Sequence, residues 1–337
     1  MKPVKKLLSA ILVLGIAVIL TGSAFAGKAF YRINNQLSVG PWAEKSGIQI
    51  APVYLASPDY SLNFLSLDQA TKQGLIEVTE TGTVNELLVE NNSKKPILLL
   101  AGEVVRGGKQ DRMVGKDMIL GPGKTRKIAV FCIEHGRWVS YEGKQDFKSS
   151  SLMADKLVRQ KAQTRGGSSG NQSRVWDEVA KSLSEYDVSA PTGNYQEILK
   201  SDKFRDGDAI AKFFLARFAN DDQIAGFVLA YNREVQSLEY FASPALAGKY
   251  KEKLIRSYVT SALKNIQDSS PIEIASIKNF ANQILSEETH QYKTDDEVLI
   301  ESRSDQLESF ELLTPRLKTV HYARYLGTAA GDSTRGD

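Results

Sequence analysis

A long uncharged stretch near the N-terminus constrains the fold most, because it separates a leader from the chain that folds. Residues 7–20 are uncharged and mainly apolar, and they follow a segment that carries three lysines. Ala24-Phe25-Ala26 then supplies a small-x-small cleavage pattern. We therefore expect a signal peptide over residues 1–26, cleavage after Ala26, and a mature protein that is exported, either periplasmic or secreted.

The same stretch has one alternative interpretation, an uncleaved membrane anchor. No charged residue lies between Lys6 and Lys28, and a membrane-spanning helix needs about 20 residues. The Ala-x-Ala pattern and the break at Gly22 favour cleavage. No second long apolar run follows, so we expect contact with a membrane only transiently, through the signal sequence.

Removal of the leader leaves a chain without net charge. The full sequence has 43 lysines and arginines against 40 acidic residues, and three of the lysines precede residue 7. The mature chain then has equal numbers of acidic and basic side chains. Nothing in its charge indicates nucleic acid as a partner, and we expect none.

A packed core must stabilise the mature chain. Cys132 is the only cysteine, so no intrachain disulfide can form outside the cytoplasm. The sequence has 42% hydrophobic and 25% charged residues, which is the composition of a globular protein. Its length suits one large domain or two moderate ones.

The pattern of apolar residues predicts an α+β protein. Its N-terminal half is expected to be β-sandwich-like and its C-terminal half to mix helices with strands. The halves can share one core, because the last strands can return to the first sheet. The expected segments are a signal peptide (1–26), a β-rich half (27–162), a flexible connector (163–174), an α+β half (175–326) and a disordered tail (327–337).

Individual elements follow from local patterns. In residues 128–133 both strand faces are apolar, which is typical of a central strand covered on both sides. A hairpin is expected around Asn232-Arg233, and a long helix over residues 246–266, where apolar residues recur every four positions. Ser270-Pro271 has the pattern of a helix N-cap and first-turn proline. Other β-prone runs lie at 47–55, 74–79, 85–90, 95–102, 118–120, 297–301, 309–313 and 320–326.

Two polar segments in the first half differ from ordinary scaffold. One covers residues 102–112, and the other begins at Glu134 directly after the buried strand. If strands 95–102 and 126–134 lie in one sheet, both segments leave it near one edge and their side chains gather there. The candidate ligand-binding residues are Glu103, Arg106, Lys109, Gln110, Arg112, Glu134, Arg137 and Trp138.

These segments also carry a family resemblance. Gly-Glu-x6-Gln-Asp-Arg in residues 102–112, followed by Val-Phe-Cys-Ile-Glu-His-Gly-Arg-Trp in 130–138, resembles the ARG and Rhodanese-Phosphatase-superfamily-associated protein domain family. The resemblance continues through 175–179 and 190–193 and covers most of residues 60–325. His135 departs from the pattern, in which a glutamine is expected. The resemblance implies a fold and a gene neighbourhood, and it brings no assigned catalytic residue.

The first polar segment has the composition of an anion cradle. Gly107 and Gly108 can adopt positive φ and turn backbone N–H groups inward, while Arg106, Lys109 and Arg112 add positive charge. The alternative is a tight turn in which Asp111 and Glu103 pair with neighbouring bases. The sequence leaves both open.

Other candidate chemistry is weaker. Cys132 and His135 invite a thiol-nucleophile hypothesis, but positions three apart face opposite sides of a strand, which favours Cys132 as a small core residue. The three histidines have no metal-ligand spacing, so no metal and no cofactor are expected. Trp176 is expected in the core and Pro191-Thr192-Gly193 in a turn.

The preferred functional hypothesis is a non-enzymatic, extracytoplasmic binding or interaction module for a small anionic ligand or a protein partner. No nucleophile, base and orienting group stand together in the sequence. One alternative is a hydrolase of a phosphorylated or nucleotide-like ligand, with Glu103 or Glu134 as base and Arg112 or Arg137 holding the anion. The other is a cell-surface structural protein.

Overall fold

The computed structural model describes residues 30–136, 147–163, 168–285 and 288–327. The expected signal peptide, its cleavage site, Arg137, Trp138 and the tail from residue 328 lie outside the described residues. The chain forms both helices and strands, and the strands make several sheets. This confirms the α+β class. Within the described ranges, no helix is both long and apolar enough to cross a membrane.

Strands dominate both ends of the described chain, and helices lie mainly between residues 156 and 282. The strands are β1 (Tyr31–Arg32), β2 (Leu37–Val39), β3 (Ala43–Lys45), β4 (Ile48–Leu55), β5 (Leu65–Ser66), β6 (Ile76–Glu80), β7 (Glu86–Asn91), β8 (Ile97–Leu99), β9 (Glu103–Arg106), β10 (Arg112–Val114), β11 (Met118–Leu120), β12 (Thr125–Cys132), β13 (Lys148–Met153), β14 (Gly226–Tyr231), β15 (Glu234–Phe241), β16 (Glu288–Lys293), β17 (Val298–Arg303), β18 (Leu307–Leu313) and β19 (Thr319–Leu326). The helices are α1 (Leu67–Lys72), α2 (Lys156–Gln163), α3 (Ser168–Glu185), the 3-10 helix η1 (Tyr195–Lys200), α4 (Asp202–Arg217), α5 (Pro244–Asn265) and α6 (Ala275–Asn282).

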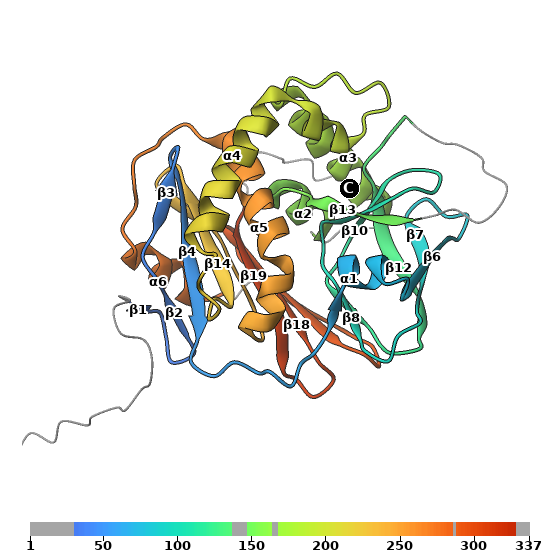
Figure 1. Ribbon diagram of the computed structural model, residues 1–337, viewed down its shortest axis with the longest axis horizontal. Coiled ribbons are helices and arrows are strands. Elements are labelled where there is room, and N and C mark those ends of the chain that lie inside the picture. The colour runs from blue at the N-terminus through green and yellow to red at the C-terminus, as the bar shows by residue number, and fades with distance from the viewer. Residues whose placement is uncertain (1–29, 137–146, 164–167, 286–287, 328–337) are drawn as a thin grey trace, which may run out of the picture.

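The largest sheet joins the two ends of the chain. Its strand order is β1-β2-β4-β14-β15-β19-β18-β17-β16, with β3 paired to β4. The first strands therefore share a sheet with the last, and residues 31–55 do not belong to a separate first half. The last strands thus return to the first sheet, and residues from both expected halves share one buried cluster, as the sequence allowed. In Figure 1 the first strands of this sheet lie on the left, and α5 crosses in front of it.

The β14–β15 hairpin forms where the sequence predicts it. Tyr231 pairs with Glu234, and the two residues between them, Asn232 and Arg233, have φ of 54° and 61°. Two successive residues with positive φ give the turn the twist that antiparallel strands require. The Asn232 side chain also accepts hydrogen bonds from the N–H groups of Gln267 and Asp268, which fixes the chain after α5.

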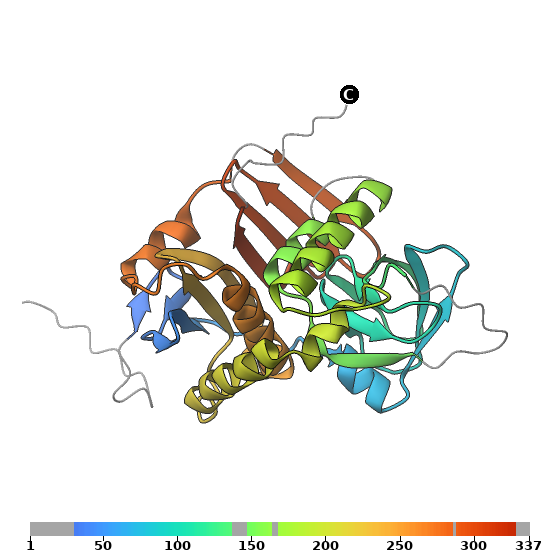
Figure 2. The same cartoon turned by 90° about the horizontal axis from the view of Figure 1, so that it is seen from above.

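Helix α5 is the central element of the molecule. Ser243 caps its first turn and Pro244 occupies a first-turn position, and the helix continues to Asn265, in agreement with the predicted helix over 246–266. Leu246, Leu254 and their neighbours pack against the large sheet. The Tyr250 hydroxyl donates a hydrogen bond of 2.8 Å to the Leu98 carbonyl on the other side. Figure 2 shows α5 between the large sheet and the smaller β-rich part.

Helix α6 begins later than its sequence pattern predicts. Ser270-Pro271 was expected to start this helix, but the first helical residue is Ala275 and no side chain caps it. The reason lies in β4, because the Gln49 side chain accepts a hydrogen bond of 2.8 Å from the Ile272 N–H. This contact ties the segment before α6 to the sheet and keeps it out of the helix.

The remaining strands form a small lobe, which we define as residues 65–153. A six-stranded sheet in the order β13-β9-β10-β12-β7-β6 packs on a three-stranded sheet in the order β11-β8-β5. Leu87, Val114 and Ile128 from the first sheet share a buried cluster with Leu99 and Leu120 from the second, so the packing is sandwich-like. The premise that strands 95–102 and 126–134 lie in one sheet is wrong, because β8 and β12 belong to different sheets.

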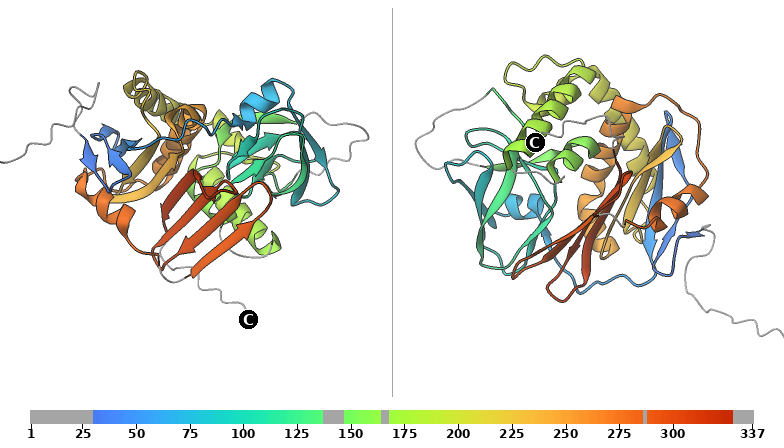
Figure 3. Two further views of the ribbon diagram at one scale, coloured as in Figure 1. Left: turned by 90° about the horizontal axis from the view of Figure 1, so that it is seen from below. Right: turned by 180° about the vertical axis from the view of Figure 1, so that it is seen from behind.

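The opposite face of the six-stranded sheet is covered by helices. Phe131 and Ile133 pack against Val158 of α2 and Val179 of α3, while Ile128 faces the other way. Strand β12 is therefore covered on both faces from Val130 onward, as predicted for its end, whereas Ala129 on the helix-facing side is exposed. Figure 3 shows α2 and α3 beside the small lobe. It also shows β17–β19, the part of the large sheet that reaches toward this lobe.

The flexible connector expected over 163–174 is wrong for its described residues, which belong to helices. Gln163 ends α2 and residues 168–174 form the first turns of α3, while residues 164–167 lie outside the described part. The composition is that of a linker, but Gln172 is buried and hydrogen-bonds both backbone groups of Cys132. Tertiary contacts thus override the local composition.

Candidate functional site

The end of β12 is held between two loops from distant parts of the chain. The Ile133 N–H donates to the Asp111 carbonyl at 3.2 Å, and the Tyr195 N–H donates to the Ile133 carbonyl at 2.9 Å. Glu134 and Asn194 form an isolated antiparallel bridge. The loop before β10 and the loop before η1 therefore meet at this point, directly after the buried strand.

Glu134 is the centre of the resulting polar cluster. One carboxylate oxygen accepts the Thr192 hydroxyl at 2.9 Å, and the other accepts the Asp111 N–H at 3.3 Å. Its backbone carbonyl accepts the Gln110 side-chain amide at 3.0 Å. Gln110 and Glu134 are thus brought together as expected. Both side chains are buried, and the Glu134 carboxylate binds groups of its own chain.

Asp111 completes the cluster from the β9–β10 loop. One carboxylate oxygen accepts the Gly107 N–H at 3.0 Å, which closes the loop on itself. The other accepts the side-chain amides of Asn194 (3.1 Å) and Gln196. These two amide hydrogen bonds fix the loop before η1 to the loop before β10.

Cys132 is a core residue and not a nucleophile. Its thiol donates to the Glu134 carbonyl at 3.1 Å, and its backbone N–H and carbonyl bind the Gln172 side chain at 2.8 and 2.9 Å. Burial raises the pKa of the Cys132 thiol, although the Glu134 N–H and the charge of Arg112 partly oppose this. A thiol with a raised pKa is mostly protonated at neutral pH and reacts slowly.

Of the remaining predicted site residues, those that the structure describes do not gather in one cleft. Glu103 is fully buried, accepts the Leu100 N–H at 3.0 Å and pairs with Lys253 of α5 at 3.0 Å. Burial raises the pKa of Glu103, and Lys253 partly opposes the rise. Arg106 is exposed at the end of β9. Arg137 and Trp138 lie outside the described residues.

At the Gly107-Gly108 turn, where an anion cradle was expected, a carboxylate of this chain accepts a backbone N–H. Both glycines have positive φ, and the Lys109 N–H donates to the Glu80 carboxylate at 2.8 Å. Arg112 is fully buried, and its guanidinium lies 3.8 Å from Glu80. The loop therefore binds the β6 carboxylate in the way that a cradle would bind an external anion.

Four residues of this region were not predicted from the sequence. Gln172, Thr192, Asn194 and Gln196 all contact the end of β12 or Asp111. Thr192 lies within the segment 190–193 that carries the family resemblance, and the other three lie within three positions of 175–179 or 190–193, which is the one signal that points to them. The turn expected at Pro191-Thr192-Gly193 is confirmed, because the Gly193 N–H donates to the Ala190 carbonyl at 2.9 Å.

A groove opens beside this cluster, along the outer face of α3. Its volume is about 430 Å³. The His135 ring meets the Trp176 ring edge-on, with centroids 4.3 Å apart. Trp176 is therefore half-buried at the groove rather than enclosed in the core. The lining residues are His135, Ser173, Trp176, Asp177, Val179, Ala180, Leu183 and Gly193.

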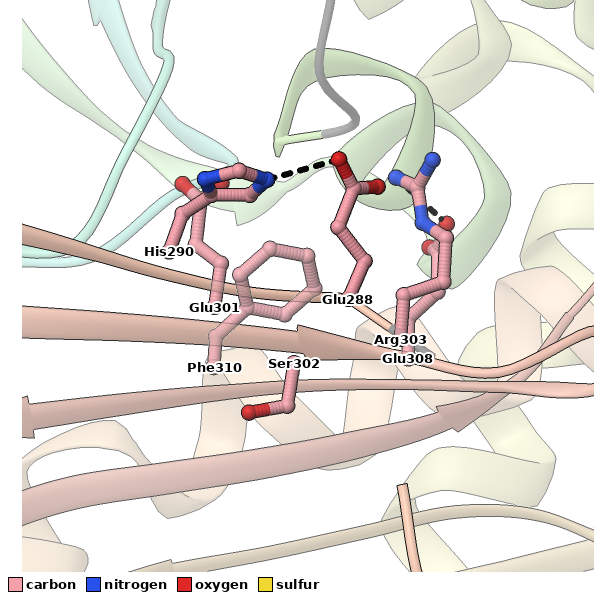
Figure 4. A pocket seen from close by; sticks show the side chains of 7 residues that line it. All are labelled: Glu288, His290, Glu301, Ser302, Arg303, Glu308 and Phe310. Carbon is pink, nitrogen blue, oxygen red and sulfur yellow. Dashed lines mark hydrogen bonds and ion pairs between the residues drawn. The ribbon is translucent and has the colours of Figure 1, made fainter. Parts of the chain in front are cut away.

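A second hollow, on the face of β16–β18, is too small for a ligand. Its volume is about 10 Å³, which is room for a single water molecule. Figure 4 shows His290 beside Glu288 at one end and Arg303 beside Glu308 at the other. The first pair lies within β16, and the second joins β17 to β18. Over the described ranges, no group of His, Cys, Asp and Glu side chains is arranged to hold a metal ion.

Comparison with known protein families identifies the family of the chain. The model of the ARG and Rhodanese-Phosphatase-superfamily-associated Protein domain matches residues 36–325. The chain belongs to this family. The matched range contains every element described above from β2 to β18 and most of β19, so the family domain is the whole fold rather than one lobe. No curated protein and no solved structure matches the chain.

Proposed function

We propose that this family member is an exported, non-enzymatic binding module whose ligand site is the groove along α3. The observation that carries the proposal is the groove itself. Its volume of about 430 Å³ lies in the range of small-molecule sites, and it adjoins the polar cluster at the end of β12. The cluster fixes His135 and the turn at Gly193, so the groove wall is rigid on that side.

The lining indicates the chemistry of the ligand. Trp176, Val179 and Leu183 supply apolar and aromatic surface. Asp177 is exposed, and among the described residues it is the one acidic side chain that lines the groove, while no described lysine or arginine lines it. A planar, apolar ligand with a positively charged amine would complement this surface. The groove thus favours a cationic ligand over the anionic one expected from the sequence.

The hydrolase alternative has less support from the same geometry. Its two candidate bases, Glu103 and Glu134, are buried and bound to groups of their own chain. A general base must reach the proton that it removes, directly or through one water. Neither carboxylate lines the groove.

Tryptamine and indole-3-acetate test the proposal as a pair of planar probes that differ in charge. We expect saturable tryptamine binding by isothermal titration calorimetry, and weaker binding of indole-3-acetate because Asp177 repels its carboxylate. Asp177→Asn should weaken tryptamine binding about 3-fold, the size of an exposed ion pair. Asp187→Asn is the matched control, since Asp187 is exposed one turn beyond the groove. If neither probe binds, the groove is not the ligand site.

Export is tested separately. N-terminal sequencing of protein recovered outside the cytoplasm should begin at Gly27, because the expected cleavage follows Ala26. A membrane-bound protein that still begins at Met1 would instead support the uncleaved anchor.

A further inference from the structure

Arg112 is a buried cation with incomplete pairing. Its side chain is fully buried, and its Nε donates to the Val84 carbonyl at 2.9 Å. Among the residues that the structure describes, none forms a hydrogen bond with Nη1 or Nη2. Buried guanidinium groups ordinarily bind carboxylates or phosphates through two parallel hydrogen bonds, since an unpaired buried charge is costly.

The carboxylate nearest to Arg112 is held by another group. Glu80 lies 3.8 Å from the guanidinium, which is beyond hydrogen-bonding distance. The Lys109 N–H donates to Glu80 at 2.8 Å. Gly108 has φ of 63°, and a Cβ at this position would collide with the Phe147 ring and with the Glu80 carboxylate. The turn therefore leaves room for a carboxylate group beside Phe147, and Arg112 lies near that group without a hydrogen bond to it.

From this geometry we propose that Arg112 and the Gly107–Lys109 turn form a binding site for a small oxyanion, a phosphate or a carboxylate, and that Glu80 occupies it in the unliganded protein. The incoming anion replaces the Glu80 carboxylate and hydrogen-bonds to both Nη atoms. Glu80 is displaced toward solvent, from which its side chain is already 14% exposed. The positive charge of Arg112 also acts on the Cys132 thiol, where it opposes the rise in the pKa that burial causes.

This site is separate from the groove along α3. It uses β6, the β9–β10 loop and β10, and shares no residue with the groove lining. It requires an anion, whereas the groove favours a cation. Anion binding at the Arg112 site and cation binding in the groove can therefore be measured independently.

The test uses Glu80→Gln, which keeps the shape of the side chain and removes the competing charge. Melting temperatures are measured in sodium phosphate, sodium acetate and sodium chloride at equal ionic strength. Phosphate or acetate should raise the melting temperature of Glu80→Gln by about 3 °C or more over chloride, and that of the wild type by less. Glu86→Gln is the matched control, because Glu86 pairs with Lys127 elsewhere on the lobe. It should respond as the wild type does.

A second variant ties the response to Arg112. In Glu80→Gln/Arg112→Lys the anion response should disappear, because an ammonium cannot make two parallel hydrogen bonds. If this variant does not fold, broadening of the ³¹P signal of inorganic phosphate by Glu80→Gln and by wild type gives the same comparison. A preference for phosphate over acetate identifies a phosphorylated ligand, and equal responses identify a carboxylate. The proposal is wrong if Glu80→Gln responds to neither anion more than the wild type does.

Discussion

His321 lies fully buried between two carboxylates, 2.7 Å from Asp117 and 3.6 Å from Glu239. Burial alone would lower the pKa of His321, but the two carboxylates outweigh it and raise the pKa to about 9. The histidine is thus a cation at neutral pH and joins β19 to the loop before β11. Nothing in the spacing of the three histidines predicts this role.

At the residue scale, His321 makes stability depend on pH. An unfolded histidine has a pKa of about 6.5. The stabilisation is complete below that pH and is lost as pH rises toward 9. Relative to His321→Gln, the wild type should lose roughly 3 kcal/mol of unfolding free energy across this window. Burial lowers the pKa of Lys156 to about 8, which opposes the trend, but this effect is common to both proteins and cancels.

Urea unfolding at several pH values measures this difference. His290→Gln serves as the control, because His290 is only half-buried and its partner Glu288 is exposed. Its stability should follow the wild-type profile. Parallel profiles for the wild type and His321→Gln would contradict the assigned role of His321.

At the element scale, α3 shows how a tertiary contact overrides local composition. Residues 163–174 have the Gly- and Ser-rich sequence of a linker, yet Gln172 binds both backbone groups of Cys132. Helix α5 and the β14–β15 hairpin were predictable because their signals are local, a four-residue period and a two-residue turn. The start of α6 was not, because Gln49 from a distant strand decides it.

Gln172→Ala tests this contact. Loss of two buried hydrogen bonds should lower the unfolding free energy by about 1–3 kcal/mol, since the Cys132 backbone groups are left unpaired. Hydrogen exchange should also increase at the Cys132 amide. Arg174→Ala, an exposed position on the same helix, should change neither quantity. Equal effects of the two substitutions would show that Gln172 does not anchor α3.

The polar cluster was partly predictable at this same scale. Gln110 and Glu134 meet as expected, because β10 pairs with β12 and each polar segment adjoins one of these strands. Glu103 was assigned to the cluster on the wrong basis, since it points toward Lys253 of α5. The partners Asn194 and Gln196 come from a loop about 60 to 85 positions away and leave no local signal.

At the scale of the whole molecule, buried charges join the large sheet to the elements packed against it. Arg159 of α2 binds Glu239 of β15 through two hydrogen bonds of 3.1 and 2.8 Å, and neither side chain is exposed. Burial would raise the pKa of Glu239, but Arg159 and His321 lower it to about 2. Backbone pairing also joins distant parts of the chain, since β4 pairs with β14. Local patterns do not show which strands pair, but they allowed the last strands to return to the first sheet, and the structure has this arrangement.

Arg159→Met should therefore destabilise the entire fold. It leaves Glu239 buried without its main partner, which costs about 3–5 kcal/mol. The double variant Arg159→Met/Glu239→Gln should recover part of that loss, because the unpaired charge is gone. Denaturant unfolding should stay a single transition in the wild type. Two separate transitions, or a single variant as stable as the wild type, would contradict one shared core.

The most direct test of the central claim, that the groove along α3 binds a ligand, is the indole N–H signal of Trp176 in an NMR titration with tryptamine. The sequence has three tryptophans, and Trp176→Phe assigns the signal. Trp42 lies against a different core cluster and serves as an internal reference. We predict a saturable shift of the Trp176 signal with the Trp42 signal unchanged. A Trp176 signal that stays in place while tryptamine binds, or no binding at all, would contradict the account.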